Sequence, residues 1–320
     1  MNEILNILKG ITNENNIFCN EPMKNHTTFK TGGPAEYLVT PESKEELIEL
    51  LKVDIPKTII GNGSNLIVTD NGIKGLVIQT TKLNNYKVDN NIIEVESGVF
   101  LSRIANIAKD NSLTGFEFAC GIPGTIGGAV SMNAGAYGGE MKDVVAETEY
   151  VDDEYVVHII DNEEHNFSYR KSFFTGKDYT ILSSKIKLNN GNKDEIEVRM
   201  NELREQRNSK QPVTYPNAGS VFKRPEGYFA AKLIDDCGLK GYTIGGAQVS
   251  PLHAGFIVNI GGATSKDILN LIKHIQDTVK NNFGVELETE VKIIGEYPSS
   301  FNIFPALSDT IPTCLLPCSV

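Results

Sequence analysis

Two glycine-rich stretches of this chain have the composition of a backbone cradle for an anion. The first reads IGNGSNL from Ile60 to Leu66, and the second reads GFEFACGIPGTIGGAVSMNAGAYGG over residues 115–139. Glycine adopts φ > 0 and allows close approach to a ligand, and successive N–H groups in such turns form anion-binding nests. Two separated cradles therefore predict a large anionic cofactor with a phosphate bridge. Tight turns alone are the alternative interpretation.

Neither stretch carries a standard nucleotide-binding fingerprint. The segment from Gly121 to Gly128 does not give G-x-G-x-x-G, so a Rossmann motif is missing, and no Lys-Ser or Lys-Thr pair follows either stretch as in a P-loop. The sequence thus disfavours an ATPase and a Rossmann dehydrogenase.

Three polar positions outside these stretches have side chains suited to acid–base or anion chemistry. Arg170 lies in YRKSFF, Ser220 lies in NAGSVFKRP with Lys223 and Arg224 close by, and Glu290 begins an apolar strand. Taken singly, Arg170 and Glu290 are better explained as parts of a solvated basic turn and of a solvated strand end, and Ser220 is either a proton donor or a turn former. A triad serine would also need a base and an orienting acid, and the G-x-S-x-G elbow is missing.

Metal and thiol chemistry have little support in the sequence. The five histidines are scattered without HxxxH spacing, and CxxC does not occur. Cys314 and Cys318 lie four apart, but a structural zinc needs about four ligands. Cys120, inside the second glycine stretch, is a possible nucleophile, although a small apolar filler is the favoured interpretation. We expect no metal.

The elements that must position these residues are predicted by periodicity and capping signals. The helices expected are one capped by Ser43, Leu101–Lys109, Asp194–Lys210 with Met200 and Leu203 on its apolar side, and Ser265–Asn282 closed by Gly284. The strands expected are Lys57–Ile60, Leu66–Val68, Leu76–Gln79, Ile92–Glu96, Glu149–His158, Ile181–Leu188 and Val291–Ile294. This order predicts an α+β fold with strand–turn–strand units rather than a regular βαβ array.

Composition bounds the class of protein. A chain of 320 residues suits two domains, and its net charge of −11 disfavours nucleic acid or an anionic membrane surface as the main partner. We find no run of about 18 apolar residues as a membrane span requires, and no signal-peptide pattern at the N-terminus. Five cysteines, an odd number, fit a reducing cytoplasm. We expect a monomer.

Taken together and in order, eight segments resemble the UDP-N-acetylenolpyruvoylglucosamine reductase family of peptidoglycan precursor synthesis. The matching segments are NHTTFKTGGPA, IGNGSNLIV, GIPGTIGGAVSMNAGAYGGE, YRKSFF, LREQRNSKQP, AGSVFKRP, LIDDCGLKGYTIGGAQVSPLHAGFIVN and GVELETEVKIIGE. They cover residues 20–296. The short spacing between Tyr169 and Ser220 is similar to the branch of the family that lacks an extra substrate-capping loop.

The resemblance implies a vanillyl-alcohol-oxidase-type FAD-binding fold made of two α+β subdomains, followed by a C-terminal α+β substrate-binding domain. We expect the FAD-binding region over residues 1–188 and the substrate-binding domain over 189–297, with its final strand returning to the FAD region. Residues 298–320 are expected to be a poorly ordered tail. The FAD-binding residues it implies are Gly61, Asn62, Gly63, Ser64, Asn65, Gly121, Ile122, Pro123, Gly124, Gly127, Gly128, Asn133 and Gly135.

The reaction implied by the resemblance uses NADPH to reduce FAD, which passes hydride to C3 of an enolpyruvyl UDP-sugar before C2 is protonated. Negative charge then develops next to the substrate carboxylate, so the site needs a cation and an acid there. The family motifs match Arg170 to the residue that stabilises the enolate, Ser220 to the proton donor and Glu290 to the carboxyl partner. The substrate-binding residues it implies are Lys210, Lys223, Arg224 and His253. Lys292 departs from the Arg that is common in the family.

Two other functions would also use parts of this pattern. A flavin oxidase of an alcohol or a sugar would keep the fold, but it gives Arg170 and Ser220 no obvious task. A nucleotide-sugar sensor would keep binding without catalysis, and the presence of Arg170, Ser220 and Glu290 together disfavours it. The expected setting is cytoplasmic cell-wall biogenesis, which underlies cell shape and division.

Overall fold

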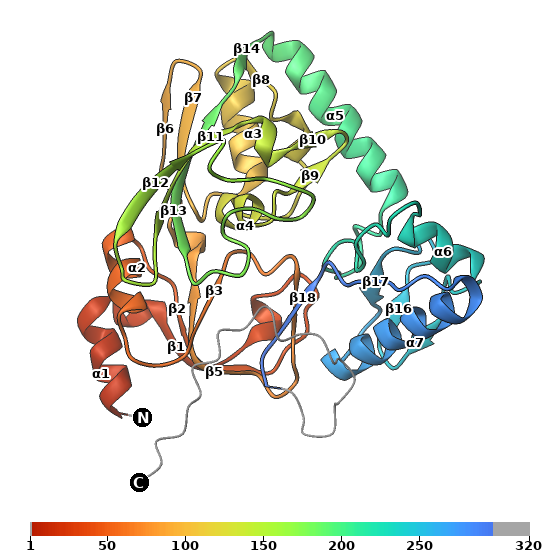
Figure 1. Cartoon of the computed structure of the whole chain (residues 1–320). Helices are drawn as coiled ribbons and strands as arrows, with labels where there is room; N and C mark the ends of the chain where they lie inside the picture. The colour runs from red at the N-terminus through yellow and green to blue at the C-terminus, as the bar shows by residue number, and fades with distance from the viewer. Residues whose placement is uncertain (1, 297–320) are drawn as a thin grey trace.

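The computed structural model describes residues 2–296, so the predicted tail over 298–320 lies outside the described residues. Its first unit is a four-stranded sheet of order β1-β2-β5-β3, in which β1 is antiparallel to β2 and the other pairs are parallel (Figure 1). The elements of this unit are α1 (Asn2–Ile11), β1 (Ile17–Pro22), β2 (Pro34–Val39), α2 (Lys44–Leu51), β3 (Lys57–Ile60), β4 (Leu66–Val68) and β5 (Ile73–Gln79).

Alternation along β5 shows how this sheet is buried on both faces. Leu76 and Ile78 pack with α1 and α2, whereas Val77 faces a second apolar cluster that includes Ile60 and Val68. Successive side chains of a strand point to opposite faces, so a continuous apolar strand needs cover on both sides. The predicted N-cap of α2 is confirmed, because the Ser43 hydroxyl accepts a hydrogen bond from the Glu46 N–H at 3.1 Å.

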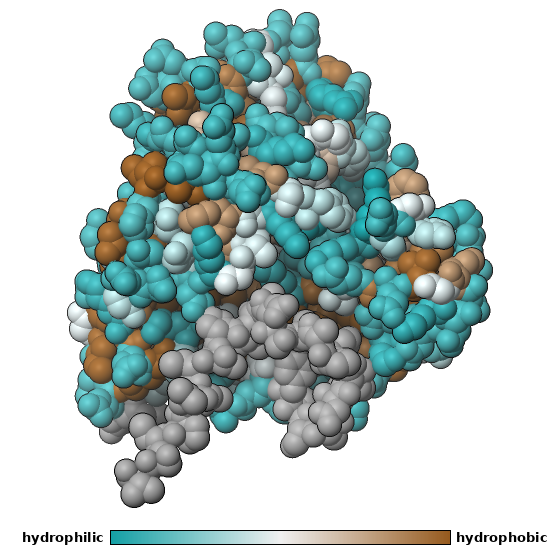
Figure 2. All heavy atoms as spheres, viewed as in Figure 1, coloured by the Kyte–Doolittle hydropathy of each residue, from teal (hydrophilic) through white to brown (hydrophobic). Residues whose placement is uncertain are grey.

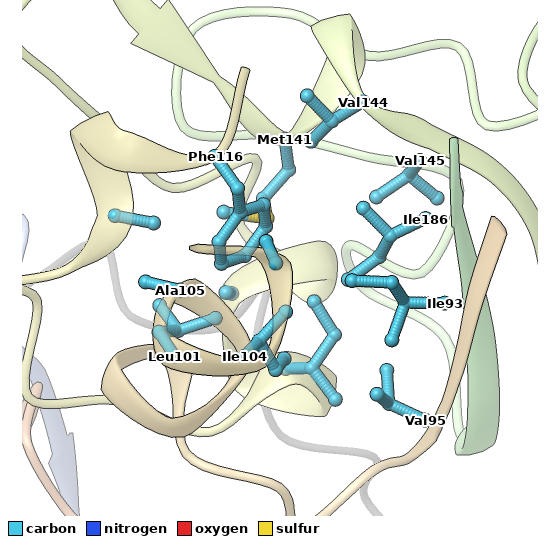
Figure 3. Close-up of a cluster of buried hydrophobic side chains, with 14 of the residues drawn as sticks. Ile93, Val95, Leu101, Ile104, Ala105, Phe116, Met141, Val144, Val145 and Ile186 are labelled. Carbon is cyan, nitrogen blue, oxygen red and sulfur yellow. The ribbon is translucent and has the colours of Figure 1, made fainter. Parts of the chain in front are cut away.

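The second unit is a five-stranded antiparallel sheet of order β12-β11-β13-β7-β6. Its elements are β6 (Tyr86–Asp89), β7 (Ile92–Glu96), α3 (Leu101–Asp110), α4 (Ile126–Ser131), β11 (Val145–Val151), β12 (Val157–Asp161) and β13 (Thr180–Lys187). Figure 3 shows the apolar cluster between this sheet and α3, where Ile93 and Val95 face Leu101 and Ile104. The helix predicted at Leu101–Lys109 is confirmed.

The single strand predicted over Glu149–His158 is wrong. The chain instead forms β11 and β12, joined by a turn in which Asp152 Oδ1 accepts hydrogen bonds from the N–H groups of Glu154 and Val156. Asp side chains readily close such turns against their own backbone. The apolar residues on both sides had concealed the break.

A single long helix, α5 (Lys193–Lys210), connects the second sheet to the C-terminal part of the chain (Figure 1). Asn192 caps its start, and the predicted apolar side is confirmed because Met200 and Leu203 are buried against the second unit. The C-terminal part contains α6 (Ala230–Asp236), α7 (Ser265–Phe283) and a three-stranded sheet of β15 (Thr243–Ile244), β16 (Ala247–Val249) and β17 (Ile257–Asn259).

Helix α7 follows its sequence signals closely. Thr264 and Asp267 form a capping box at its start, and Gly284 ends it in the left-handed conformation at φ +71°. Its apolar residues, including Ile268, Ile272 and Ile275, are buried in the C-terminal core.

The final strand, β18 (Lys292–Ile294), leaves the C-terminal part and pairs in parallel with β4, placing Lys292 opposite Leu66. The described residues also include the short strands β8 (Leu113–Thr114), β9 (Gly135–Ala136), β10 (Gly139–Glu140) and β14 (Asn189–Asn190). The return of β18 brings the chain segment around Glu290 beside the first glycine stretch.

The visible surface is largely hydrophilic, with small separated apolar areas (Figure 2). Among residues 2–296, no helix has both the length and the hydropathy required of a membrane span. The same residues contain no group of three or more His, Cys, Asp or Glu side chains placed to hold a metal ion.

Candidate active site

Ser220 lies on a short segment of chain between the segment that carries Phe256 and the segment that carries Glu290. On one side it forms a β-bridge with Phe256, and on the other the Val221 carbonyl accepts a hydrogen bond from the Glu290 N–H at 2.7 Å. An Asx turn starts the segment, because Asn217 Oδ1 accepts the Gly219 N–H at 2.9 Å and Gly219 takes a φ of +78°. Local turn chemistry thus brings Ser220 and Glu290 into neighbouring backbone positions.

Arg170 lies in a tight turn closed by reciprocal hydrogen bonds between Ser168 and Lys171. Its φ is +57°, a left-handed conformation that such turns normally give to Gly or Asn. An arginine there costs on the order of 1 kcal/mol in backbone strain. Strain of this kind is concentrated at functional sites, so the position argues that the guanidinium itself is required.

The turn delivers Arg170 to Glu290, 120 residues away in the sequence. Arg170 Nε donates to Glu290 Oε1 at 2.8 Å, and the two side chains are 20% and 11% exposed. Burial raises the pKa of the Glu290 carboxyl, although the nearby Arg170 and Lys223 charges oppose the shift. The pair is therefore a mostly desolvated carboxylate held by a guanidinium whose other N–H groups are available to an anion.

The Ser220 hydroxyl is half-buried and has no hydrogen-bond partner within residues 2–296. Asn65 connects this cluster to the first glycine stretch, since its Nδ2 donates to the Glu290 carbonyl at 3.1 Å and its carbonyl accepts the Lys292 N–H at 3.0 Å. Desolvation and repulsion by Lys223 lower the pKa of Lys292, although much of this side chain is open to solvent.

The two glycine stretches lie against each other. Asn62 Nδ2 donates to the Pro123 carbonyl at 2.6 Å. Within residues 2–296 the backbone N–H groups of Asn62, Gly63, Ser64, Asn65, Gly121 and Gly124 have no hydrogen-bond partner. Buried or confined N–H groups are normally paired, so this concentration of free donors is a ready anion-binding surface.

Several of the glycines are required by contacts within the protein as well. A Cβ on Gly63, where φ is +62°, would lie 2.1 Å from the His26 carbonyl oxygen, and one on Gly61 would lie 2.2 Å from Thr125 Oγ1. Cβ atoms on Gly127 and Gly135 would meet protein atoms at 2.9 Å and 2.7 Å. By contrast, Cβ atoms on Gly124 and Gly128 would meet only ordinary contacts, at 3.6 Å and 3.8 Å.

A cavity of about 550 Å³ lies beside these loops. Its lining includes Asn62, Gly121 and Pro123 from the glycine stretches, together with Asn217 and Phe256 from the C-terminal part. The volume is within the range of cofactor and substrate sites. It therefore extends from Asn62 and Gly121, whose N–H groups are free, to Asn217 at the start of the segment that carries Ser220. The side chains of Arg170, Ser220 and Glu290 lie outside this lining.

The dinucleotide implied by the sequence fits these residues on two observations. The free N–H groups supply uncharged donors for a diphosphate, as nests do. Thr125 Oγ1, in the second glycine stretch, is buried without a hydrogen-bond partner in the described structure. Buried polar atoms left unpaired are rare and need an explanation, and a ligand oxygen at the loops is a suitable one.

Asn133, expected next to the flavin, has its side chain fully engaged by protein. It is completely buried, its Nδ2 donates to the Ser168 carbonyl and to Glu140, and its Oδ1 accepts the Lys142 N–H. The hydrogen bond to Ser168 fixes the turn that carries Arg170. The side chain of Asn133 thus holds the Arg170 turn in place through this hydrogen bond. Ile122 packs partly buried against the core of the second unit.

The four predicted substrate-binding residues are spread around the cluster. Lys223 pairs with Glu288 on the segment beside it, and Arg224 stacks on Phe229 with its guanidinium carbon 4.5 Å from the ring centroid. Lys210 is the exposed last residue of α5, outside the lining of the cavity.

His253 also lies outside the cavity lining. It packs edge-on against Phe256, and its Nδ1 accepts the Gly255 N–H at 3.1 Å. Burial lowers the pKa of this imidazole. Burial likewise raises the pKa of the Cys120 thiol, which suits a core residue better than a nucleophile.

The cavity also exposes residues that sequence reasoning did not single out. Nine of them lie in two of the recognised segments: Asn25, His26, Thr27, Thr28 and Lys30 in NHTTFKTGGPA, and Arg204, Arg207, Asn208 and Gln211 in LREQRNSKQP. The three-residue spacing of Arg204, Arg207 and Lys210 on one helix was the signal available, because such residues share a face.

Two domain families match this chain. A family described as "FAD binding domain" matches residues 35–158, and one described as "UDP-N-acetylenolpyruvoylglucosamine reductase, C-terminal domain" matches residues 211–294. The first match contains both glycine stretches, and the second contains Ser220 and Glu290.

Whole-chain comparisons agree with these matches. The UDP-N-acetylenolpyruvoylglucosamine reductase of Caldanaerobacter subterraneus subsp. tengcongensis is 53% identical, with 90% of this chain and 97% of that protein covered. The corresponding protein of Clostridium perfringens is 48% identical, with 92% and 98% covered. A crystal structure of the Thermus caldophilus reductase is 36% identical with a TM-score of 0.75, over 85% of this chain and 97% of that one. The predicted α+β fold, a vanillyl-alcohol-oxidase-type FAD-binding region followed by a C-terminal domain, is confirmed.

Proposed function

Because this chain belongs to the UDP-N-acetylenolpyruvoylglucosamine reductase family, we propose that it uses NADPH to reduce the enolpyruvyl ether of UDP-N-acetylglucosamine to UDP-N-acetylmuramate. It is an FAD-dependent oxidoreductase. The single observation that carries the proposed chemistry is the convergence of Arg170, Glu290 and Ser220 from three separate segments beside the free N–H groups of the glycine loops.

The two glycine stretches are proposed to hold the cofactor. The unpaired N–H groups of residues 62–65, together with those of Gly121 and Gly124, would receive its diphosphate. Gly127 and Gly135 allow the adjoining backbone to pack closely, whereas Gly128 has no such contact and is proposed to lie beside the cofactor. When bound there, FAD would supply the redox chemistry, which is the transfer of a hydride from NADPH to C3 of the enolpyruvyl group.

Arg170 is proposed to bind the substrate carboxylate and the charge that develops beside it. Its Nε is committed to Glu290, which leaves the terminal nitrogens of the guanidinium for the ligand. A planar fork suits a carboxylate better than an ammonium does. Fixed charges in a site with little water stabilise a transition state most when they need no reorganisation, and the Asn133-anchored turn provides this rigidity.

Ser220 is proposed to give its proton to C2. A serine hydroxyl is a weak acid in water, but the carbon that it protonates is far more basic. Within the described chain its oxygen has no competing protein partner. Lys223, which interacts electrostatically with Glu290, and Lys292, which interacts with Lys223, would favour the alkoxide that remains. Glu290 is proposed to orient Arg170 and to limit the net positive charge of the cluster.

The diphosphate and sugar of the substrate are proposed to contact Lys210, Lys223, Arg224 and His253. Of these, Arg224 has the geometry for a bidentate phosphate contact, since its guanidinium lies on Phe229 without an acidic partner among residues 2–296. Lys210 would reach the ligand from the end of α5.

The wider setting is also part of the proposal. Residues 1–188 are assigned to FAD binding and residues 189–297 to substrate binding. The protein is proposed to act as a cytoplasmic monomer in peptidoglycan precursor synthesis, without a nucleic-acid or membrane partner.

A product assay tests this function. Purified protein with FAD, NADPH and the enolpyruvyl UDP-sugar should consume NADPH and form a product two hydrogens heavier, in equal amounts. Peroxide formation from an alcohol or a sugar, with no change in the enolpyruvyl compound, would instead identify an oxidase.

A further inference from the structure

Arg207 is a largely buried cation with no acidic partner in the described structure. It lies on the side of α5 that faces the second glycine stretch and lines the cavity. Among residues 2–296 its side chain makes no ion pair and no hydrogen bond. Burial lowers the pKa of its guanidinium, and the titratable groups that interact with it, Tyr137 and Cys120, are uncharged at neutral pH. A desolvated charge without a partner is costly, so an anion is expected to complete this site.

Gly121 makes the position of Arg207 possible. A Cβ on Gly121 would lie 2.9 Å from Arg207 Cδ and under 4 Å from Nε and Nη1. The missing side chain therefore allows the guanidinium to lie directly on the loop. The close contact with Arg207 therefore accounts for glycine at position 121.

The free donors of the loops identify the kind of anion. Asn62, Gly121 and Pro123 line the same cavity as Arg207, and the N–H groups of Asn62 and Gly121 are unpaired within the described residues. These N–H groups provide direction but carry no net charge. A diphosphate carries two negative charges, so a guanidinium is the complement that the loops themselves lack.

We propose that Arg207 binds the diphosphate of FAD, with Gly121 providing the space for it. This inference depends on the proposed placement of FAD at the glycine stretches. It assigns to α5, which connects the two parts of the chain, a direct role in cofactor retention.

The test compares full-length variants by FAD titration, using quenching of flavin fluorescence after the bound flavin has been removed. Arg207→Gln should weaken FAD binding about 10- to 100-fold, in line with the loss of charge-assisted hydrogen bonds. Arg207→Lys, which keeps the charge but not the fork, should recover part of this loss. The matched control is Arg199→Gln on the same helix, where the arginine is exposed and pairs with Glu202; it should bind FAD as the wild type does.

A double-mutant cycle links the two residues. Gly121→Ala should weaken FAD binding by displacing Arg207, and Gly121→Ala in the Arg207→Gln background should add little further loss. Thermal unfolding of each variant shows whether it is folded, and Arg207→Lys keeps the test informative if Arg207→Gln is not.

Three outcomes would overturn the assignment while leaving FAD binding by the protein intact. These are an unchanged FAD affinity in Arg207→Gln, strictly additive losses in the cycle, or a raised KM for the UDP-sugar with an unchanged FAD affinity. The last would place Arg207 in the substrate site. Failure of the wild type itself to bind FAD would contradict the proposed function instead.

Discussion

Replacing Arg170 by methionine tests the buried ion pair most directly. The substitution keeps an unbranched chain of similar length but leaves the Glu290 carboxylate, 11% exposed, without its partner. Breaking a buried pair in this way costs roughly 3–5 kcal/mol. Because Arg170 is 20% exposed, we expect the lower end, about 3 kcal/mol, near pH 8. This corresponds to a fall in Tm of roughly 5–10 °C.

The loss should depend on pH with a defined sign. Burial raises the pKa of Glu290, and the guanidinium opposes that shift. Without it, the folded-state pKa lies still further above the unfolded value. The folded variant therefore binds a proton more readily than the unfolded chain, and its deficit is largest above the folded pKa and shrinks as the pH falls through it.

The assay is thermal unfolding of the FAD-loaded variant and of the wild type, compared at the same pH, at pH 8.5 and pH 5.5. Arg170→Met combined with Glu290→Gln is the control, because it has no buried carboxylate and should show a smaller deficit that does not grow as the pH rises. Equal deficits at the two pH values for the single variant, or a double variant as unstable as the single one, would refute the reasoning.

Three further predictions concern the site. Ser220→Ala should leave reduction of the bound flavin by NADPH within about threefold of wild type while turnover falls by roughly 10²–10⁴, as followed by stopped-flow absorbance; equal losses in both half-reactions would exclude its role as the acid. Gly63→Ala should lose bound FAD and at least about 2 kcal/mol of stability, because its Cβ would lie 2.1 Å from a carbonyl oxygen. The control Gly124→Ala should be nearly neutral in stability. Flavin content and Tm are measured for each variant, and an equal fall in Tm in the two variants would contradict the contact argument. Tyr169→Phe removes the hydroxyl that accepts the Arg224 backbone N–H at 3.1 Å. In steady-state kinetics it should raise the KM for the UDP-sugar about 3- to 10-fold with little change in kcat, and an FAD titration should show an unchanged affinity. An unaltered KM would argue against this link between the Arg170 turn and the segment that carries Arg224.

Local signals in the sequence predicted the helices well. The Ser43 cap, the 18-residue α5 and the Gly284 stop of α7 each depend on residues within a few positions of one another. The hairpin between β11 and β12 was missed, because its turn is closed by a single aspartate between two apolar runs. A strand pattern alone does not show where the chain reverses.

The site was harder to derive from sequence. The pairing of Arg170 with Glu290 spans 120 positions and depends on the return of β18 to β4, which no local pattern indicates. Asn133 was expected to bind FAD, but its side chain donates a hydrogen bond to the Ser168 carbonyl in the turn that carries Arg170. This contact is also distant in the sequence. Gly63 and Gly61 were expected to make room for a ligand, yet they first make room for His26 and Thr125. Long-range packing, and not residue type, decides these cases.

The most direct test of the proposed function is an anaerobic absorbance titration of the flavin-loaded protein. Stoichiometric NADPH should bleach the flavin band, and one equivalent of the enolpyruvyl UDP-sugar should then restore it, with UDP-N-acetylmuramate recovered in equal amount. A band that NADPH bleaches but the enolpyruvyl compound leaves bleached would contradict the assignment of this protein as its reductase.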